Sequence, residues 1–209
     1  MTEADDDIVA SDGRTIGRRG AATRRRLLDA TASLLVTVPL RDLRVVDIAR
    51  EVGSSPATFY QYFRDVEEAV LVLADECGEA MAPLSVHLVG DWAGLDAARR
   101  FVDAFISFWD DHTAVLRIRN LGAQEGDPRF RDLRRQANRP FLDGLAEHVR
   151  HAQAAGRVDV GLSPIAAAAA LMSLLERMAA FHADIETMGV SRDDVVETCA
   201  RIVHQTIEG

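Results

Sequence analysis

The stretch DIAREVGSSPATFYQYF, residues 47–63, decides the fold of its end of the chain. It places a small residue, Ala49, where two helices would cross closely, and Gly53 four residues later, where the chain must turn. Ser55 followed by Pro56 is typical of the start of a second helix, because serine caps a helix and proline suits its first position. The spacing therefore predicts a helix-turn-helix.

The second helix of this pair has an apolar face and a small, polar face. At 100° per residue, Phe59, Phe63 and the ring of Tyr62 fall together toward the core. Ala57 and Gln61 point the opposite way. Both tyrosines of the chain lie in this stretch, and tyrosine suits a position where its ring is buried and its hydroxyl meets a polar group. A helix with such an outward face fits the major groove of DNA.

The residues on and around this helix carry groups that could reach DNA. Glutamine can reach base edges, and hydroxyl groups and helix N-termini can reach phosphate oxygens. Every basic residue of the chain is an arginine, whose planar guanidinium suits phosphate. The predicted DNA-binding residues are Arg24, Arg44, Ser55, Ala57, Thr58, Tyr60, Gln61, Tyr62 and Arg64.

Charge is distributed unevenly along the chain, whose formal net charge is −9. Residues 13–64 contain ten arginines against four acidic residues, whereas residues 65–209 contain fourteen arginines against 24 acidic residues. Residues 1–12 contain five acidic residues and no basic one. A basic segment on an acidic body is typical of a protein that presents one end to a polyanion such as DNA.

Helical periodicity dominates the whole chain, and no convincing hairpin signal is present. The pattern predicts an all-α fold of nine helices, the first three short and basic. Pro140 is expected to kink the helix that contains it. The predicted helices cover residues 23–38, 45–52, 56–63, 65–81, 94–111, 114–123, 127–155, 163–188 and 191 onward, with residues 83–93 as a loop.

Over about residues 22–76, the chain resembles the N-terminal DNA-binding domain of the TetR/AcrR family of bacterial transcriptional regulators. The match rests on DIAREVGSSPATFYQYF and on the acidic-capped apolar helix that follows it. Two positions depart from the family pattern: Val66 stands where the family commonly has lysine, and Ser54 stands where it usually has an aliphatic residue. Arg64 is the residue that could replace the missing lysine at a phosphate.

The resemblance implies a dimer that generally represses transcription and releases its double-stranded DNA operator when a small molecule enters the C-terminal domain. Three parts are expected: a disordered tail (1–20), because the chain begins with an acidic and polar segment, a helix-turn-helix DNA-binding domain (21–64) and a ligand-binding and dimerisation domain (65–209). The expected partners are therefore a DNA operator, a small-molecule effector and a second copy of the chain.

Alanine rows in the helix 163–188 would let helix backbones approach closely. With the last helix they could form half of a four-helix dimer bundle, as the family implies. Ordinary packing within one chain is the alternative. The predicted dimer-interface residues are Ala166, Ala170, Leu174, Met178, Phe181, Val195, Cys199 and Ile202.

An aromatic stripe and a few polar residues are the candidates for effector binding. In a mostly apolar cavity a few polar groups would orient a lipophilic or aromatic molecule, although each aromatic residue could equally be plain core. The predicted ligand-binding residues are Phe105, Phe108, Trp109, Arg117, Asn120, Gln124, Asn138 and Phe141.

Other functional classes find little support. The six histidines show no metal-ligand spacing, and the two cysteines lie far apart, so we expect no metal, no cofactor and a cytoplasmic location. No nucleophile elbow or phosphate loop is present, so no catalytic residue is predicted and the chain is not expected to be an enzyme. No apolar run is long enough for a membrane span.

Two alternative functions stay open. One is a helical small-molecule-binding protein or enzyme. The other is a non-specific DNA architectural protein, which the acidic body disfavours.

Overall fold

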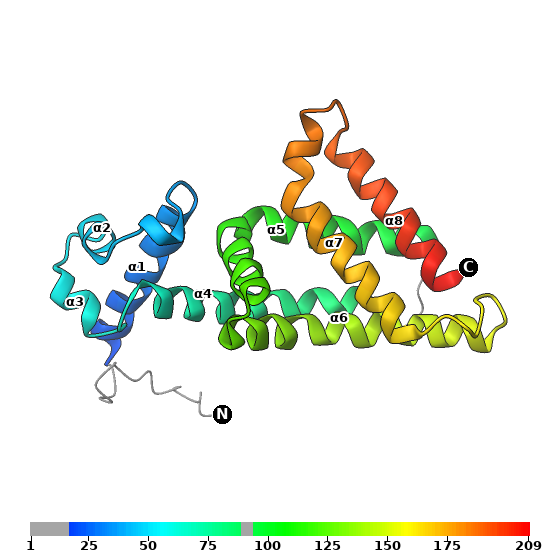
Figure 1. Ribbon diagram of the computed structural model, residues 1–209, viewed down its shortest axis with the longest axis horizontal. Helices are drawn as coiled ribbons and strands as arrows, with labels where there is room; N and C mark the ends of the chain where they lie inside the picture. The colour runs from blue at the N-terminus through cyan, green and yellow to red at the C-terminus, as the bar shows by residue number, and fades with distance from the viewer. Residues whose placement is uncertain (1–16, 89–93) are drawn as a thin grey trace.

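The computed structural model describes residues 17–88 and 94–209, and within them no strand occurs. These residues form eight α-helices and two short 3-10 helices, η1 (Leu40–Asp42) and η2 (Ala82–Leu88) (Figure 1). The prediction of an all-α fold is confirmed. The α-helices are α1 (Arg18–Leu35), α2 (Val45–Glu51), α3 (Pro56–Tyr60), α4 (Val66–Met81), α5 (Gly94–Glu125), α6 (Pro128–Ala154), α7 (Pro164–Glu186) and α8 (Arg192–Glu208).

Two predicted segments extend beyond the described residues. Residues 1–16 of the predicted tail, 1–20, lie outside the described ranges. Residues 18–20 belong to α1, which begins at Arg18. The predicted loop, 83–93, is a 3-10 helix as far as Leu88, and its last five residues lie outside.

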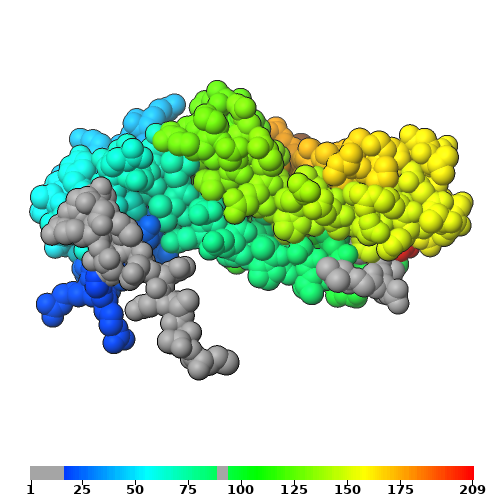
Figure 2. Space-filling view, turned by 90° about the horizontal axis from the view of Figure 1, so that it is seen from below, coloured from blue at the N-terminus to red at the C-terminus, as the bar shows by residue number. Residues whose placement is uncertain are grey.

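Helices α1–α3 form a head at one end of the molecule, and α4 leads from the head into the body (Figure 1). In the body α6 lies alongside α4, and α7 and α8 pack on α5 and α6. A space-filling view shows the head at one end and the surface of α6 along the body (Figure 2). One buried apolar core extends from Leu27 in α1 to Ile207 in α8. Because α4 packs on both α1 and α6, the domain boundary at residue 65 stays a prediction.

The count of nine helices was one too many, because the predicted helices 94–111 and 114–123 are one continuous helix, α5. At the expected break, the Thr113 hydroxyl donates to the carbonyl of Trp109, and the His112 ring bonds the carbonyl of Phe108. Side chains that bond the backbone one turn earlier often bend a helix without ending it. The ribbon of α5 does change direction part-way along its length (Figure 1).

Helix α6 also continues through a predicted irregularity. It runs without interruption from Pro128 to Ala154 although Pro140 lies inside it. Proline has no N–H to donate to the carbonyl four residues earlier, which here belongs to Gln136. Both residues are exposed, so water can bond the carbonyl that proline leaves open.

The turn between α2 and α3 is built as the sequence predicted. Gly53 has φ of +65°. Its N–H donates to the carbonyl of Arg50, and the N–H of Ser54 donates to the carbonyl of Ala49. These two bonds form a Schellman motif, which closes a helix through a residue in the left-handed region. The Ser55 hydroxyl then accepts the N–H of Thr58 and caps α3.

Replacement of Gly53 by alanine should destabilise the protein by about 1–2 kcal/mol, because a Cβ disfavours positive φ. A Cβ added at this glycine would meet no neighbouring atom within 4 Å, so the cost is conformational rather than steric. Asparagine tolerates this backbone region better, so Gly53→Asn should cost less than Gly53→Ala. Urea denaturation of the three proteins checks this; equal stability of native protein and Gly53→Ala would contradict it.

Candidate DNA-binding surface and buried polar cluster

Helix α3 presents a small, polar face outward on an aromatic base. Phe59 and Phe63 are buried, with ring centroids 5.3 Å apart. Ala57 and Gln61 are exposed, and Tyr60 is 52% exposed. Thr58 of this helix and Tyr62, beyond its end, are half-buried, and Ser55 is exposed at the helix start. The helix therefore has a surface of the size and polarity that enters a major groove.

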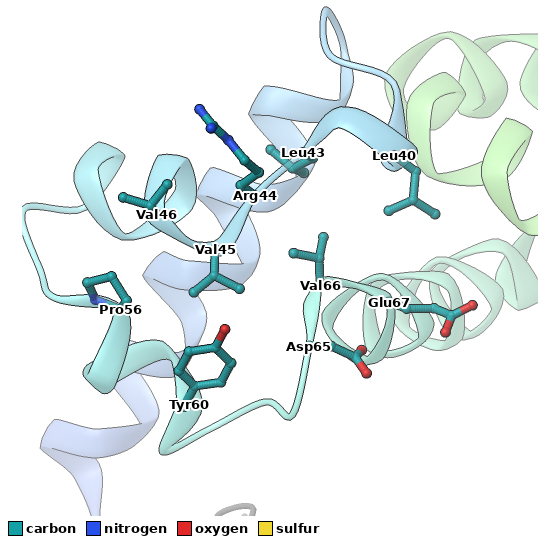
Figure 3. A pocket seen from close by; sticks show the side chains of 10 residues that line it. All are labelled: Leu40, Leu43, Arg44, Val45, Val46, Pro56, Tyr60, Asp65, Val66 and Glu67. Carbon is teal, nitrogen blue, oxygen red and sulfur yellow. The ribbon is translucent and has the colours of Figure 1, made fainter.

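An open groove of about 610 Å³ lies beside this face, between the start of α2 and the start of α4 (Figure 3). Arg44 stands on its α2 side, Tyr60 extends from α3, and Asp65 and Glu67 stand on its α4 side. Much of the rest of the lining is apolar and includes Val66. The acidic side of the groove would repel phosphate, so the groups that can meet a DNA backbone here are the guanidinium and the hydroxyl.

The predicted arginines of the head are held by neighbours within it. Arg44 Nε lies 3.0 Å from the carboxylate of Asp47, and its side chain is 73% exposed. The guanidinium of Arg24 lies over the ring of Phe63, 5.2 Å from its centroid. Exposed ion pairs of this kind contribute little to stability, so Arg44 can exchange its carboxylate for a phosphate at small cost.

Arg64 is positioned by the cap of α4. The carboxylate of Glu68 accepts the backbone N–H of Arg64 at 2.5 Å and lies 3.3 Å from its Nε. The carboxylate of Asp65 accepts the N–H of Glu68 at 2.8 Å. Asp65 and Glu68 thus form a capping box in altered form, because Glu68 reaches back to Arg64 instead of Asp65. The paired guanidinium is 72% exposed and lies next to the head.

A buried polar cluster joins α5, α6 and α7 in the body. Its centre is Glu176 of α7, which is 5% exposed. One carboxylate oxygen, Oε1, lies 3.4 Å from Nη2 of Arg119, 3.3 Å from Nδ2 of Asn120 and 3.1 Å from Nδ2 of Asn138. The other oxygen accepts from Arg134. Three helices therefore meet through one carboxylate.

Arg119 is fully buried, and its pKa depends on the charges of its neighbours. Burial lowers the pKa of its guanidinium, the carboxylate of Glu176 raises it, and the charge of Arg134 lowers it further. The loss of hydration lowers the pKa of Arg119 more than the attraction of Glu176 raises it. A buried arginine keeps its charge through such neighbours, so Glu176 is the group that makes this charge tolerable in the core.

The predicted ligand-binding residues divide into four sets. Phe105, Trp109 and Phe141 are buried in the core, and Asn120 and Asn138 belong to the polar cluster. Phe108 is half-buried and stacks on His112 at a centroid distance of 4.2 Å. Arg117 and Gln124 are exposed, and Arg117 lies over the ring of Phe181, so their contact with an effector stays a prediction.

Sequence reasoning missed the three charged members of the cluster, Arg119, Arg134 and Glu176. A signal was present for two of them. Arg119 follows the buried pair Val115 and Leu116 at the spacing of an apolar helical face. Glu176 occupies a core position of a helix that is otherwise rich in alanine and leucine. A charge at a core position is rare unless it is paired.

The predicted dimer-interface residues divide between the surface of the protomer and its interior. On α7, Ala166 and Ala170 are exposed, and Leu174, Met178 and Phe181 are half-buried. On α8, Ile202 is exposed, whereas Val195 and Cys199 are buried inside the protomer. The assignment of Val195 and Cys199 to an interface is corrected, because the apolar face of α8 packs on α5 of the same chain.

Within the described ranges, α7 is the one helix long and apolar enough to cross a membrane, but only 39% of its most apolar window is buried. Length and composition alone do not make a membrane segment, since apolar helices of other folds meet the same test. What the helix shows is an uncovered apolar stripe, with Ile165 51% exposed at its start. Such a stripe is typical of a protein–protein interface.

His182 of α7 links two helices and should make stability depend on pH. Its Nδ1 lies 2.9 Å from a carboxylate oxygen of Glu186, and its Nε2 bonds Asp110 of α5, which also meets Arg192 of α8. Partial burial acts to lower the pKa of His182, but the bonds to Asp110 and then Glu186 outweigh it and raise the pKa.

A histidine whose pKa is raised on folding stabilises the protein fully below its unfolded pKa of about 6.5 and loses that contribution as the pH rises through the folded pKa. His182→Gln should therefore lower the free energy of unfolding more at pH 5.5 than at pH 8.5. Urea denaturation at both pH values checks this, with His87→Gln, an exposed histidine of η2, as control. An equal loss at both pH values would contradict it.

Ion pairs link α4 to the head on one side and to α6 on the other. Arg25 of α1 lies 2.7 Å from Glu76, near the far end of α4. Arg129, in the first turn of α6, lies 3.0 Å from Glu67, in the first turn of α4 beside the groove. Helix α6 thus contacts the DNA-proximal end of α4 through Arg129, and it enters the buried cluster one to three turns later.

Two family models match the chain. "Tetracyclin repressor-like, C-terminal domain" matches residues 87–209, and "Bacterial regulatory proteins, tetR family" matches residues 27–70. A relative described as an uncharacterised HTH-type transcriptional regulator from Haemophilus influenzae is 30% identical over 131 residues, or 62% of this chain. The match spans 64% of that relative, slightly less than two thirds of its length.

Solved structures share the fold at low sequence identity. A TetR-family regulator from Rhodococcus sp. matches with a TM-score of 0.63 at 20% identity, over 90% of this chain and 99% of that chain. FadR from Bacillus subtilis in complex with stearoyl-CoA matches with a TM-score of 0.65 at 14% identity, over 88% of this chain and 98% of that one. FadR from Bacillus halodurans, a fatty acid degradation regulator, matches with a TM-score of 0.66 at 15% identity, over 94% and 97%.

Proposed function

Because the chain belongs to the TetR family of bacterial regulatory proteins, we propose that it is a ligand-responsive transcriptional regulator. It binds a pseudo-palindromic operator as a homodimer, represses transcription in the cytoplasm and releases DNA when a small apolar effector binds its body. Its family and fold are those of transcriptional regulators and not of enzymes. The observation that carries the proposal is the outward face of α3, held on buried Phe59 and Phe63 beside Arg44 and Tyr60.

Each contact group on this surface has a separate task. Gln61 reaches base edges in the major groove, and Arg44 and Tyr60 hold the adjacent phosphates. Arg64 supplies the positive charge for a phosphate contact at the start of α4, where Val66 stands in place of the lysine common in the family. Because α3 carries no arginine or lysine of its own, base recognition rests on the glutamine and on groove shape, while the arginines fix the position of the head.

The dimer forms through the uncovered stripe of α7 and the outward face of α8. Ala166, Ala170, Leu174 and Met178 recur at the spacing of one helix face, and small residues let two helix backbones approach closely. Ile202, 38% exposed, extends the surface onto α8. Two copies of such a helix pair would bury both stripes in a four-helix bundle with two-fold symmetry.

Effector binding would act on DNA by shifting the population between two spacings of the heads. Two heads fit one face of DNA when their recognition helices lie about 34 Å apart. Helix α6 carries both Arg134 and Asn138 of the buried cluster and Arg129, which holds Glu67 of α4. A displacement of α6 would therefore move the DNA-proximal end of α4, and with it the head.

A gel shift with the DNA upstream of the chain's own gene and its neighbours tests the function. We expect a specific complex that survives an excess of random DNA, with no effector added. Binding to no such fragment at low salt, or equal affinity for random DNA, would contradict it.

Replacement of Gln61 by alanine should lower operator affinity roughly tenfold to a hundredfold, because a base contact discriminates by about 1–3 kcal/mol. Binding to random DNA should change little, since Gln61 is not a phosphate contact. Fluorescence anisotropy on both DNAs measures this, with Gln136→Ala, an exposed glutamine of α6, as control. Full affinity in both Gln61→Ala and Tyr60→Ala would contradict the assigned face.

A further inference from the structure

The buried cluster has more positive than negative charge. Arg119 and Arg134 bring two guanidinium groups to the single carboxylate of Glu176. Among the described residues, Nη1 of Arg119 has no hydrogen-bond partner although the side chain is fully buried. Buried polar groups in proteins are nearly always bonded, so an unbonded guanidinium N–H in the core indicates a place for a further acceptor.

Helix α6 leads from the cluster to a buried aromatic group. Phe141 lies one helical turn from Asn138 on α6, and both are buried. Its ring centroid lies 6.2 Å from that of Phe101 and 6.1 Å from that of Phe105, both on α5. Apolar walls with a few convergent polar groups are typical of small-molecule sites.

We propose that the effector is an apolar molecule with one carboxylate, which binds Arg119 and Arg134 in competition with Glu176. This proposal rests on the proposed function and specifies its effector. A carboxylate supplies the acceptor that Nη1 of Arg119 lacks, and it neutralises the excess charge. A neutral ligand would leave that charge in place, and a cation would add to it. The apolar part of the molecule occupies the region of Phe101, Phe105 and Phe141.

Access to the cluster is through Arg134. Its side chain is 37% exposed, whereas those of Arg119 and Glu176 are 0% and 6% exposed. An incoming carboxylate therefore meets Arg134 first and displaces Glu176 from it. Glu176 belongs to α7 and Arg134 belongs to α6, so this exchange releases Arg134 of α6 from α7. This change at Arg134 acts on α6, the helix whose Arg129 pairs with Glu67 of α4.

Calorimetric titration of the full-length protein with matched acids and alcohols tests the proposal. The probes are octanoic acid against 1-octanol and 4-phenylbutyric acid against 4-phenyl-1-butanol. A charge-assisted bond strengthens binding by roughly tenfold to a hundredfold. We expect at least one acid to bind that much more tightly than its alcohol. No binding of either acid at millimolar concentration, or equal affinity of acid and alcohol, would overturn the proposal.

Two variants, each with a matched control variant, show which residues cause the preference for the acid. Arg134→Gln, a partly exposed position that should fold, is expected to abolish the preference for the acid. Arg135→Gln, at its exposed neighbour, is expected to keep it. Arg119→Met should also abolish it, and Arg100→Met, at an exposed arginine of α5, should keep it. An undiminished preference in Arg134→Gln would overturn the assignment. None of these titrations contains DNA, so they can fail while specific operator binding, and with it the proposed function, is retained.

Discussion

Glu176→Ala is expected to lower the free energy of unfolding by about 3–5 kcal/mol, because it leaves the charge of Arg119 buried and without its carboxylate. Arg119 would keep its hydrogen bond to Oδ1 of Asn120, at 3.1 Å. An amide oxygen cannot neutralise a guanidinium. The same change removes the acceptor that joins Asn120 of α5 and Asn138 of α6 to α7. The effect should thus exceed that of any exposed acidic residue on this helix.

Urea denaturation measures this loss, with Asp184→Ala as the control. Asp184 is an exposed acid of α7, and its loss should cost less than about 1 kcal/mol. The double variant Arg119→Met with Glu176→Leu should recover the part of the stability that depends on the buried charge, because an apolar pair of similar volume often replaces a buried ion pair without loss. Asn120 and Asn138 stay without their acceptor, so the recovery should be partial. Equal stability of Glu176→Ala and Asp184→Ala would show that the cluster carries no such constraint.

Leu174→Glu is expected to convert the proposed dimer to a monomer and to lower operator affinity by roughly 10²–10⁴-fold. A two-fold interface contains the substituted position twice, so two carboxylates would be buried there at a cost of several kcal/mol. Two linked heads bind with an effective concentration that separate heads lack, which accounts for the loss of affinity.

Sedimentation velocity gives the oligomeric state, and anisotropy with operator DNA gives the affinity. Gln136→Glu introduces the same charge on the exposed surface of α6 and should leave both unchanged. A Leu174→Glu protein that stays dimeric, with full operator affinity, would place the interface elsewhere. Thermal denaturation of the monomer distinguishes loss of the interface from loss of the fold.

The head was predictable from sequence because its architecture is encoded locally. The positive φ of Gly53 and the cap by Ser55 are each set by one residue type at one position. The faces of α3 followed from its 100° periodicity, and the structure buries Phe59 and Phe63 as expected. Whether its outward residues contact DNA stays a prediction.

The body was less predictable because its features depend on distant residues. Periodicity identified an apolar face on α8 but not which partner covers it, so Val195 and Cys199 were assigned to a second chain although they pack within their own. Arg119 and Glu176 lie 57 positions apart and are paired only in the folded protein. A charged residue at a core position of a helix was the available signal.

The break expected near residue 112 shows the limit of local patterns. Polar side chains at His112 and Thr113 interrupt the apolar stripe, which favoured two helices. In the structure these side chains bond carbonyls of the preceding turn, and the helix continues. A bend within a helix and the end of a helix give similar sequence patterns. The side-chain hydrogen bonds of His112 and Thr113 distinguish the two cases in the folded protein.

Footprinting of the native protein on the DNA upstream of its gene tests whether a dimer reads two major grooves. We expect one protected region with two related half-sites whose centres lie about 34–36 Å apart, or a multiple of that spacing. We also expect this pattern to vanish in Gln61→Ala and in Leu174→Glu at protein concentrations that saturate the native complex. Uniform protection of any DNA, or a single half-site bound equally well by Leu174→Glu, would contradict a dimeric regulator that reads two major grooves.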